Sequence, residues 1–135
     1  MRIEDVLRNK GAAVTTIAPQ TPVSQLLAGL VGMNIGAMVV VGVDGLVGIV
    51  SERDVVRKLH ERGASLLVQP VSEIMTTVVV TCTPRDTVDQ LAVLMTDNRV
   101  RHVPVLDEDR LVGIVSIGDV VKSRMSELET EQKQL

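Results

Sequence analysis

The feature that most constrains this chain is a segment that occurs twice. Residues 45–56 return as residues 110–121, and in both copies a run of β-branched residues ends in Ser-x-x-Asp and passes into a helical pattern. An ungapped comparison of residues 14–58 with residues 79–123 gives 17 identities in 45 positions, whereas about 3 are expected from ordinary residue frequencies. The chain is therefore an internal duplication. Two copies are too few for a solenoid, so we expect two equivalent units packed about a pseudo-twofold axis.

Composition limits the kinds of partner. The 135 residues suit one domain of ordinary size, and each half alone would be marginal. With no Phe, Tyr or Trp and a net charge of −3, the chain lacks the aromatic platforms and the basic surface that nucleic-acid binding requires. No apolar run reaches the roughly 18 residues that span a bilayer, no signal peptide is recognisable, and the single Cys82 cannot form an internal disulfide. We therefore expect a cytoplasmic protein with neither nucleic acid nor membrane as partner.

Hydrophobic periodicity predicts the same order, β-α-β-β-α, in each copy. In the first copy we expect a lead helix over 1–10, a strand over 14–17, a helix over 23–31, strands over 37–41 and 46–50, and a helix from Ser51. In the second copy we expect a lead segment at 71–75, a strand over 78–82, a helix at 88–95 behind an Asp86 or Thr87 cap, strands over 102–106 and 111–115, and a helix from Ser116. The predicted fold class is α+β, with motif 1 over about 1–62, a packed linker over 63–70 and motif 2 over about 71–130. We expect the polar end of the chain, 126–135, to be a helical tail that frays.

The Ser-x-x-Asp pairs, Ser51 with Asp54 and Ser116 with Asp119, admit two interpretations. A serine at a helix N-cap and an acidic residue three positions later form a capping box, which is the simpler explanation of the spacing. A helix N-terminus is also favourable for an anion such as phosphate. A carboxylate beside it can accept hydrogen bonds from a ribose diol, so the same residues also suit a nucleotide site.

The repeated motif, the β-α-β-β-α order and the duplication together resemble the cystathionine-β-synthase (CBS) domain pair, also called a Bateman module. The resemblance covers nearly the whole chain, and its most specific segments are residues 48–54, 113–119 and 101–107. It implies a regulatory module of two CBS motifs rather than an enzyme. Modules of this kind bind adenosine nucleotides in clefts between the motifs: AMP, ADP or ATP, and in some cases NAD or S-adenosylmethionine.

The resemblance also implies roles for individual residues. Asp54 and Asp119 would hold ribose hydroxyls, with Ser51 and Ser116 beside the ribose or the phosphate. The base and phosphate would be flanked by the strand openings near Thr16 and Thr81 and by the segments at Ala37 and His102.

The two copies differ in their cations. Arg99, Arg101 and His102 belong to the second copy and Arg53 to the first; their counterparts are Asn34, Gly36, Ala37 and Gly118. We therefore expect one cleft rich in phosphate-binding cations and one poorer. For His102, phosphate contact and a satisfied structural histidine are both open at this point.

Two expectations concern the space a ligand would occupy. Gly48 and Gly113, three residues before the serines, would let a ligand approach the strand backbone closely. Because the chain has no aromatic residue, adenine would have to sit between aliphatic side chains such as Ile17, Met38 or Val103.

The sequence offers no catalytic constellation. It has no Ser-His-Asp set, no Cys with its own His, no Walker-type phosphate loop and no cluster with metal-ligand spacing, so we expect no enzyme activity, no metal and no required cofactor. The alternative is an interaction module in which the motifs serve assembly and no ligand binds. In either case the resemblance implies a homodimer formed through exposed helix faces, with Met33, Met95 and Met125 as candidate contacts, and an effector protein regulated in trans.

Overall fold

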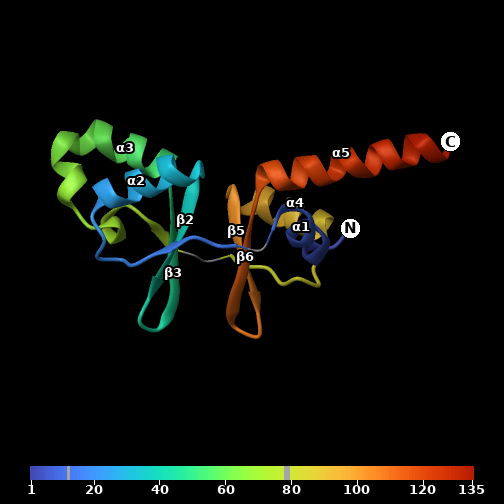
Figure 1. Ribbon diagram of the computed structural model, residues 1–135, viewed down its shortest axis with the longest axis horizontal. Coiled ribbons are helices and arrows are strands. Elements are labelled where there is room, and N and C mark those ends of the chain that lie inside the picture. The colour runs from blue at the N-terminus through green and yellow to red at the C-terminus, as the bar shows by residue number, and fades with distance from the viewer. Residues whose placement is uncertain (12, 78–79) are drawn as a thin grey trace. The chain divides into compact units, whose positions relative to one another are not determined.

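Two units built of helices and strands make up the chain in the computed structural model, which describes residues 1–11, 13–77 and 80–135 (Figure 1). Unit 2 is Val14–Val79, and unit 1 combines Met1–Ala13 with Val80–Leu135. Each unit packs helices against an antiparallel hairpin, so the chain belongs to the α+β class.

Unit 2 follows the β-α-β-β-α order predicted for the first copy. Its elements are β1 (Thr16–Ile17), α2 (Val23–Met33), β2 (Ala37–Gly42), β3 (Gly45–Ser51), α3 (Glu52–Arg62), the 3₁₀ segments η1 (Gly63–Val68) and η2 (Val71–Glu73), and β4 (Thr76–Thr77). The sheet order is β1-β2-β3-β4, with β1 parallel to β2 and the later pairs antiparallel. Strand β4 was not predicted, because its two exposed threonines carry no alternating apolar pattern.

Unit 1 repeats this arrangement around the second hairpin. Its elements are α1 (Ile3–Lys10), α4 (Val88–Asn98), β5 (His102–Asp107), β6 (Arg110–Ser116) and α5 (Ile117–Gln134). Cys82 forms a single parallel bridge with Val105, equivalent to the pair of Ile17 and Val40 in the parallel β1-β2 ladder of the other unit. The register shifts between Val40 and Val41 in one hairpin and between Val105 and Leu106 in the other. The duplication therefore extends to an irregularity of the backbone.

The predicted helices and hairpin strands are confirmed, but the opening strands are shorter than predicted. Residues 14–17 give only β1. Of the strand expected over 78–82, residues 78 and 79 lie outside the described residues, and residues 80 and 81 lie in no strand. The predicted ends are confirmed, because β1 stops at Ile17 and the bridge of the second segment is at Cys82, each two residues before a proline, Pro19 or Pro84, that cannot donate to a ladder.

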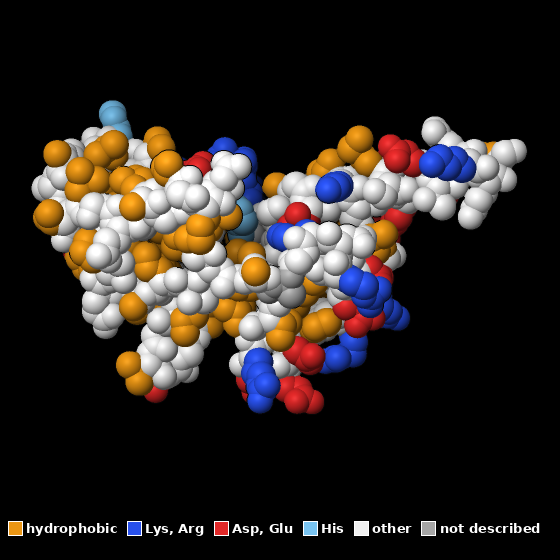
Figure 2. Space-filling view, viewed as in Figure 1, with side chains coloured by type: hydrophobic (Ala, Val, Ile, Leu, Met, Phe, Trp, Pro, Cys, Tyr) orange, Lys and Arg blue, Asp and Glu red, His pale blue; other side chains and the backbone are white. Residues whose placement is uncertain are grey.

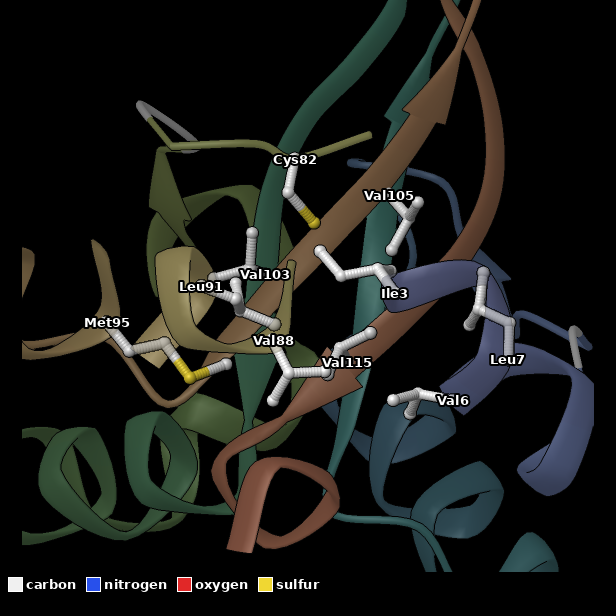
Figure 3. Packing of buried hydrophobic residues seen from close by; sticks show 10 residues of the cluster. All are labelled: Ile3, Val6, Leu7, Cys82, Val88, Leu91, Met95, Val103, Val105 and Val115. Carbon is white, nitrogen blue, oxygen red and sulfur yellow. The ribbon is translucent and has the colours of Figure 1, made fainter. Parts of the chain in front are cut away.

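Each unit buries its own apolar cluster. In unit 2 the stripe of α2 that contains Val23, Leu26 and Leu30 packs with residues of β2 and β3. In unit 1 the side chains of α1, α4, β5 and β6 converge, with Ile3 and Leu91 among those seen in Figure 3. Both cores are filled by aliphatic and sulfur-containing side chains, as the composition requires.

This burial corrects two predictions. Met38 and Val103 are 3% and 0% exposed, so they belong to the cores of their units and cannot flank an adenine. Met95 is 2% exposed and packs inside unit 1, whereas Met33 and Met125 are exposed as predicted. The error has one cause: periodicity identifies an apolar position but does not say which of two faces a neighbouring element covers.

The lead segments pack with the opposite copy. Helix α1, which precedes the first copy in sequence, joins the core of unit 1 with the second copy's hairpin. The segment that precedes the second copy, with Val71, Ile74 and Met75, joins the core of unit 2. The repeats in sequence and the units in space therefore have different boundaries. Local periodicity cannot reveal this exchange, because it marks an amphipathic segment and not its partner.

The exchange explains the two glycines of the repeated strand. A Cβ atom on Gly113 would lie 2.6 Å from Cδ2 of Leu7, and one on Gly48 would lie 2.8 Å from the backbone oxygen of Thr76. The space beside each glycine is thus filled by a lead segment. The expectation that these glycines admit a ligand is wrong, since close packing within the unit already accounts for them.

The linker packs, as expected, through Leu66, which is fully buried against the core of unit 2, while Val68 is exposed. The tail at 126–135 is helical, as predicted, since α5 continues to Gln134. Among the described residues no helix combines the length and the apolar character needed to cross a bilayer.

Candidate ligand-binding turns

The first Ser-x-x-Asp turn joins β3 to α3. Ser51 is the N-cap of α3, and its hydroxyl accepts a hydrogen bond from the Asp54 amide at 3.4 Å. Oδ2 of Asp54 accepts hydrogen bonds from the Ser51 amide at 2.8 Å and from the Ser51 hydroxyl at 3.1 Å. This is a reciprocal capping box, so the capping interpretation is confirmed. It engages Oδ2, and within the described residues no hydrogen bond is recorded to the other carboxylate oxygen, Oδ1.

The second turn joins β6 to α5 with the same geometry. The Asp119 amide donates to the Ser116 hydroxyl at 3.2 Å, and the Ser116 amide donates to Oδ2 of Asp119 at 2.8 Å. Here the same oxygen has a further partner, because Nζ of Lys10 donates to it at 2.6 Å. Lys10 also donates to the backbone oxygen of Ile114 at 2.9 Å. The second carboxylate is therefore clamped by the lead helix α1.

Lys10 sets the charge state of the second turn. Burial opposes the charge on Asp119, but the hydrogen bond from Lys10 and the one from the Ser116 amide outweigh it, and the pKa of Asp119 lies below its ordinary value. The first turn has no equivalent, since no cation among the described residues lies within ion-pair distance of Asp54, and the segment 71–79 contains no Lys or Arg. The sequence does not reveal the role of Lys10, because its pairing with Asp119 depends on the exchanged lead segment.

The neighbouring strands place further candidates beside each turn. In the β2-β3 ladder Ala37 lies opposite Ser51, and in the β5-β6 ladder His102 lies opposite Ser116. The first amide of each helix donates to the residue just before the same strand: Glu52 to the Gly36 oxygen at 3.0 Å and Ile117 to the Arg101 oxygen at 2.9 Å. Each turn is thereby fixed to the strand that sequence analysis placed next to it.

Three arginines stand near the turns with no ion pair among the described residues, namely Arg53, Arg99 and Arg101. Arg53 is in the first turn of α3, where the positive end of the helix dipole disfavours a cation. Arg99 caps α4 in the left-handed conformation with φ of 55°, where the first copy has Asn34 with φ of 53°. Asparagine tolerates this conformation far better than arginine does. Arg53 and Arg99 therefore sit against local preference, as residues with a binding role often do.

The two threonines predicted from sequence, Thr16 and Thr81, lie in the segments that open the two copies. Thr16 is exposed in β1, where it pairs with Val39, two residues from Ala37. Thr81 is exposed next to Cys82, whose bridge ties this segment to β5. Both threonines therefore belong to the strand openings named from sequence, although neither contacts the Ser-x-x-Asp turn of its unit by any recorded hydrogen bond among the described residues.

The remaining reactive groups do not form a site. Cys82 is buried, and burial, with the nearby charge of Asp86, raises the pKa of its thiol to about 12, so it stays protonated and inert. Within the described ranges no group of three or more His, Cys, Asp or Glu side chains could hold a metal ion.

Comparison with known proteins gives a consistent result. The family model of the CBS domain matches residues 3–61 and 71–126. The chain is 36% identical to the CBS domain-containing protein CBSX3, mitochondrial, of Arabidopsis thaliana, and the match covers 98% of this chain and 69% of that protein.

Solved structures resemble the whole chain. The CBS-domain containing protein ATU1752 of Agrobacterium tumefaciens has 45% sequence identity and a TM-score of 0.86, covering 91% of this chain and 92% of that one. The CBS domain pair of protein MJ0100, in complex with 5′-methylthioadenosine and S-adenosyl-L-methionine, has 26% identity and a TM-score of 0.82, covering 94% and 98%.

Proposed function

The chain belongs to the CBS domain family, and we propose that it is a regulatory sensor that binds an adenosine nucleotide, AMP, ADP, ATP or NAD, without acting on it chemically. A CBS domain pair of similar structure is in complex with two adenosine compounds, 5′-methylthioadenosine and S-adenosyl-L-methionine. The shared part of those compounds and of the nucleotides is adenosine, so the ribose and the base are the groups that the chain would recognise.

The observation that carries the proposal is the half-buried carboxylate of Asp54. Its capping bonds engage Oδ2, and no cation of the described residues neutralises it. A ribose diol donates two hydrogen bonds, and bonds to a charged acceptor contribute roughly 1.5–3 kcal/mol each. Arg53, the preceding residue, is exposed and unpaired among the described residues, so it suits the phosphate of the same ligand.

The turn at Asp119 would bind a ribose with a different affinity from the turn at Asp54. Lys10 occupies an oxygen of the carboxylate, so a ribose there competes with an ion pair at 2.6 Å or binds beside it. Arg99, Arg101 and His102 belong to the same unit and would favour a ligand with more phosphate charge. We infer that the Asp54 turn takes the ribose of any adenosine ligand and that the Asp119 turn requires phosphate as well.

Isothermal titration calorimetry tests this directly. The panel is AMP, ADP, ATP, NAD and S-adenosylmethionine against the wild type, Asp54→Asn, Asp119→Asn and the control Asp97→Asn, an exposed carboxylate on α4. We expect Asp54→Asn to weaken adenosine binding roughly tenfold or more, because one charged acceptor is lost, and Asp97→Asn to leave it unchanged. A panel that shows no heat and no thermal shift with any ligand would reject the sensor function.

A ligand-independent interaction module is the second candidate, and the exposed apolar stripe of α5 favours it. Thermal unfolding distinguishes the two functions. A ligand at 100 times its dissociation constant adds about 2.7 kcal/mol to the stability of a sensor and nothing to that of a module that binds no ligand. In both cases we propose a homodimer that regulates an effector protein in trans. A cytoplasmic setting is part of the proposal, and the lone, inert Cys82 supports it.

A further inference from the structure

Helix α1 is fixed to unit 1 at its N-terminal end. The amide of Ile3 donates to the backbone oxygen of Asp86 at 2.9 Å. The side chains of Ile3, Val6 and Leu7 pack in the core of the unit (Figure 3). None of residues 8–10 is buried. The C-terminal end of α1, residues 8–10, therefore depends on polar contacts for its position.

Those contacts come from one side chain, that of Lys10. Its Nζ donates to Oδ2 of Asp119 at 2.6 Å and to the backbone oxygen of Ile114 at 2.9 Å, and these two hydrogen bonds form a clamp. Arg8 pairs with Asp5 of the same helix, so it does not fasten α1 to the rest of the unit. Within the part of the chain that the structure describes, no other recorded side-chain hydrogen bond ties this end of α1 to β6 or α5. The clamp therefore holds the C-terminal end of α1 in place.

The first copy covers the equivalent strand edge in a different way. Ile114 corresponds to Ile49, which pairs with Thr76 of β4 in a backbone ladder. In unit 1 the ammonium group of Lys10 meets the edge at Ile114 instead. A lysine side chain is a flexible stem that can swing away without breaking a ladder. Unit 1 thus has a removable cover at the position where unit 2 has a paired strand.

The clamp differs from the exposed ion pairs around it. Charged side chains of both signs lie close together on the surface of unit 1 (Figure 2), and exposed pairs such as Arg8 with Asp5 add little to stability. The side chains of Lys10 and Asp119 are only 33% and 19% exposed, so water and salt screen their attraction less. The end of α1 therefore depends on one ammonium group, which loses a partner when another donor takes the carboxylate.

We propose that a ligand at the Asp119 turn opens this clamp and frees the C-terminal end of α1, while the rest of the helix stays docked. The inference rests on the proposed function, since it needs a ribose at this turn. A ribose diol that donates to Asp119 competes with Lys10 for the carboxylate. When Lys10 leaves, the backbone oxygen of Ile114 is uncovered as well. Occupancy of the turn is thereby converted into a change at an exposed helix end, which an effector protein can detect.

Amide hydrogen exchange followed by NMR tests the release. The probe is the amide of Gly11, which donates to the backbone oxygen of Leu7 at 2.8 Å and so reports whether the end of α1 is closed. AMP is the first ligand, because it joins the ribose to a single phosphate, and the other compounds of the panel follow. We expect saturating AMP to speed this exchange roughly tenfold in the wild type, because a charge-assisted bond that holds the helix end is lost. The exchange of the Ile3 amide should not change.

Two variants isolate the clamp. Lys10→Met should exchange as fast without ligand as the wild type does with it, and AMP should add nothing. The matched control is Lys58→Met, which removes a lysine of the other unit and should respond as the wild type does. Neither lysine is buried, so both variants should fold, which far-UV circular dichroism checks. Because coupling is reciprocal, Lys10→Met should tighten AMP binding at the second turn by the factor by which AMP speeds exchange in the wild type.

The possible outcomes distinguish this inference from the proposed function. Heat of binding that Asp119→Asn abolishes, with unchanged exchange at Gly11, would overturn the release and leave the sensor function intact. Binding that only Asp54→Asn weakens would do the same, since no ligand would then reach the clamp. An absence of heat with every compound of the panel would reject the sensor function itself, and the ligand-driven opening with it.

Discussion

The Ser51-Asp54 turn and the Ser116-Asp119 turn have the same sequence pattern and the same capping box, yet they offer a ligand different carboxylates. Asp54 is bonded only within its own turn among the described residues, whereas Asp119 is also held by Lys10 at 2.6 Å. The difference comes from the lead segments. Helix α1 supplies a lysine to one turn, and the shorter lead segment at 71–77 supplies no cation to the other. A duplication can thus keep its motif and still diverge in function through the elements packed against it.

The largest expected effect is on the free energy of unfolding, and it compares how rigidly the two lead segments pack. A Cβ on Gly48 meets the backbone oxygen of Thr76 at 2.8 Å, whereas the three atoms nearest to one on Gly113 are all side-chain carbons of Leu7, the closest at 2.6 Å. Since a leucine side chain can rotate and a paired backbone cannot, we expect Gly48→Ala to lower the free energy of unfolding by about 3 kcal/mol and Gly113→Ala by about 1 kcal/mol. Urea unfolding measures both. Equal losses would mean that the lead segments are equally rigid.

The next largest effect compares how much each of the two carboxylates, Asp54 and Asp119, stabilises the fold. Asp119→Asn removes a cap acceptor and leaves Lys10 without its anion, so we expect a loss of about 1.5 kcal/mol in unfolding free energy. Asp54→Asn weakens the cap alone, and we expect a loss of about 0.5 kcal/mol. Ligand affinity should respond in the opposite order, with the larger loss for Asp54→Asn. If Asp119→Asn were the less destabilising of the two, the ion pair with Lys10 would not hold the turn in solution.

The sequence alone predicts the structural elements that depend on the local pattern of residues. The hairpins, the helices from Val23 and Val88, and the caps at Ser51 and Ser116 follow from periodicity and from capping chemistry, which act within a few residues. The sequence left Asp86 and Thr87 as alternative caps for α4, and the structure selects Thr87, whose hydroxyl accepts from the Gln90 amide at 3.1 Å.

What sequence could not supply depends on which distant segment covers a surface. The clamp of Lys10 on Asp119 joins residues 109 positions apart, and the filled space at Gly48 and Gly113 depends on the exchanged lead segments. The errors at Met95 and Met38 have the same origin, because an apolar residue on a helix or strand has the same pattern whether a neighbour covers it or not. Candidate site residues were identifiable by type and spacing, but their partners were not.

A smaller effect, dependent on pH, tests the clamp itself. We expect Lys10→Met to lower the free energy of unfolding by about 1 kcal/mol at pH 7, because one charge-assisted hydrogen bond is lost. The folded-state pKa of Asp119 lies below its ordinary value of 3.8, so the ionised form contributes stability above that value, and the contribution disappears as pH falls through the folded pKa. The difference between wild type and Lys10→Met should therefore be constant down to about pH 5 and then shrink toward pH 2.

The same variant should open the second turn. With Lys10→Met, the Asp119 carboxylate has only its capping bonds, as Asp54 has, and calorimetry should give a stronger second binding event for adenosine ligands that carry little phosphate. A matched control is Lys58→Met, since Lys58 belongs to the other unit and pairs with Glu61 on α3. A second event that is weaker in Lys10→Met than in wild type would show instead that Lys10 is itself a ligand contact.

The smallest expected effect concerns the left-handed caps that end α2 and α4. Arg99 and Asn34 share this conformation, with φ of 55° and 53°, and asparagine adopts it at lower cost. Arg99→Asn should therefore raise the free energy of unfolding by about 0.5 kcal/mol while weakening binding of ATP more than of S-adenosylmethionine, because a cation near the second turn is lost. Asn34→Gly, at the equivalent cap of the first copy, controls for the backbone. If Arg99→Asn stabilised the protein without changing selectivity between these ligands, the arginine would have no role in phosphate binding, and the cations of the second copy would not distinguish the two turns.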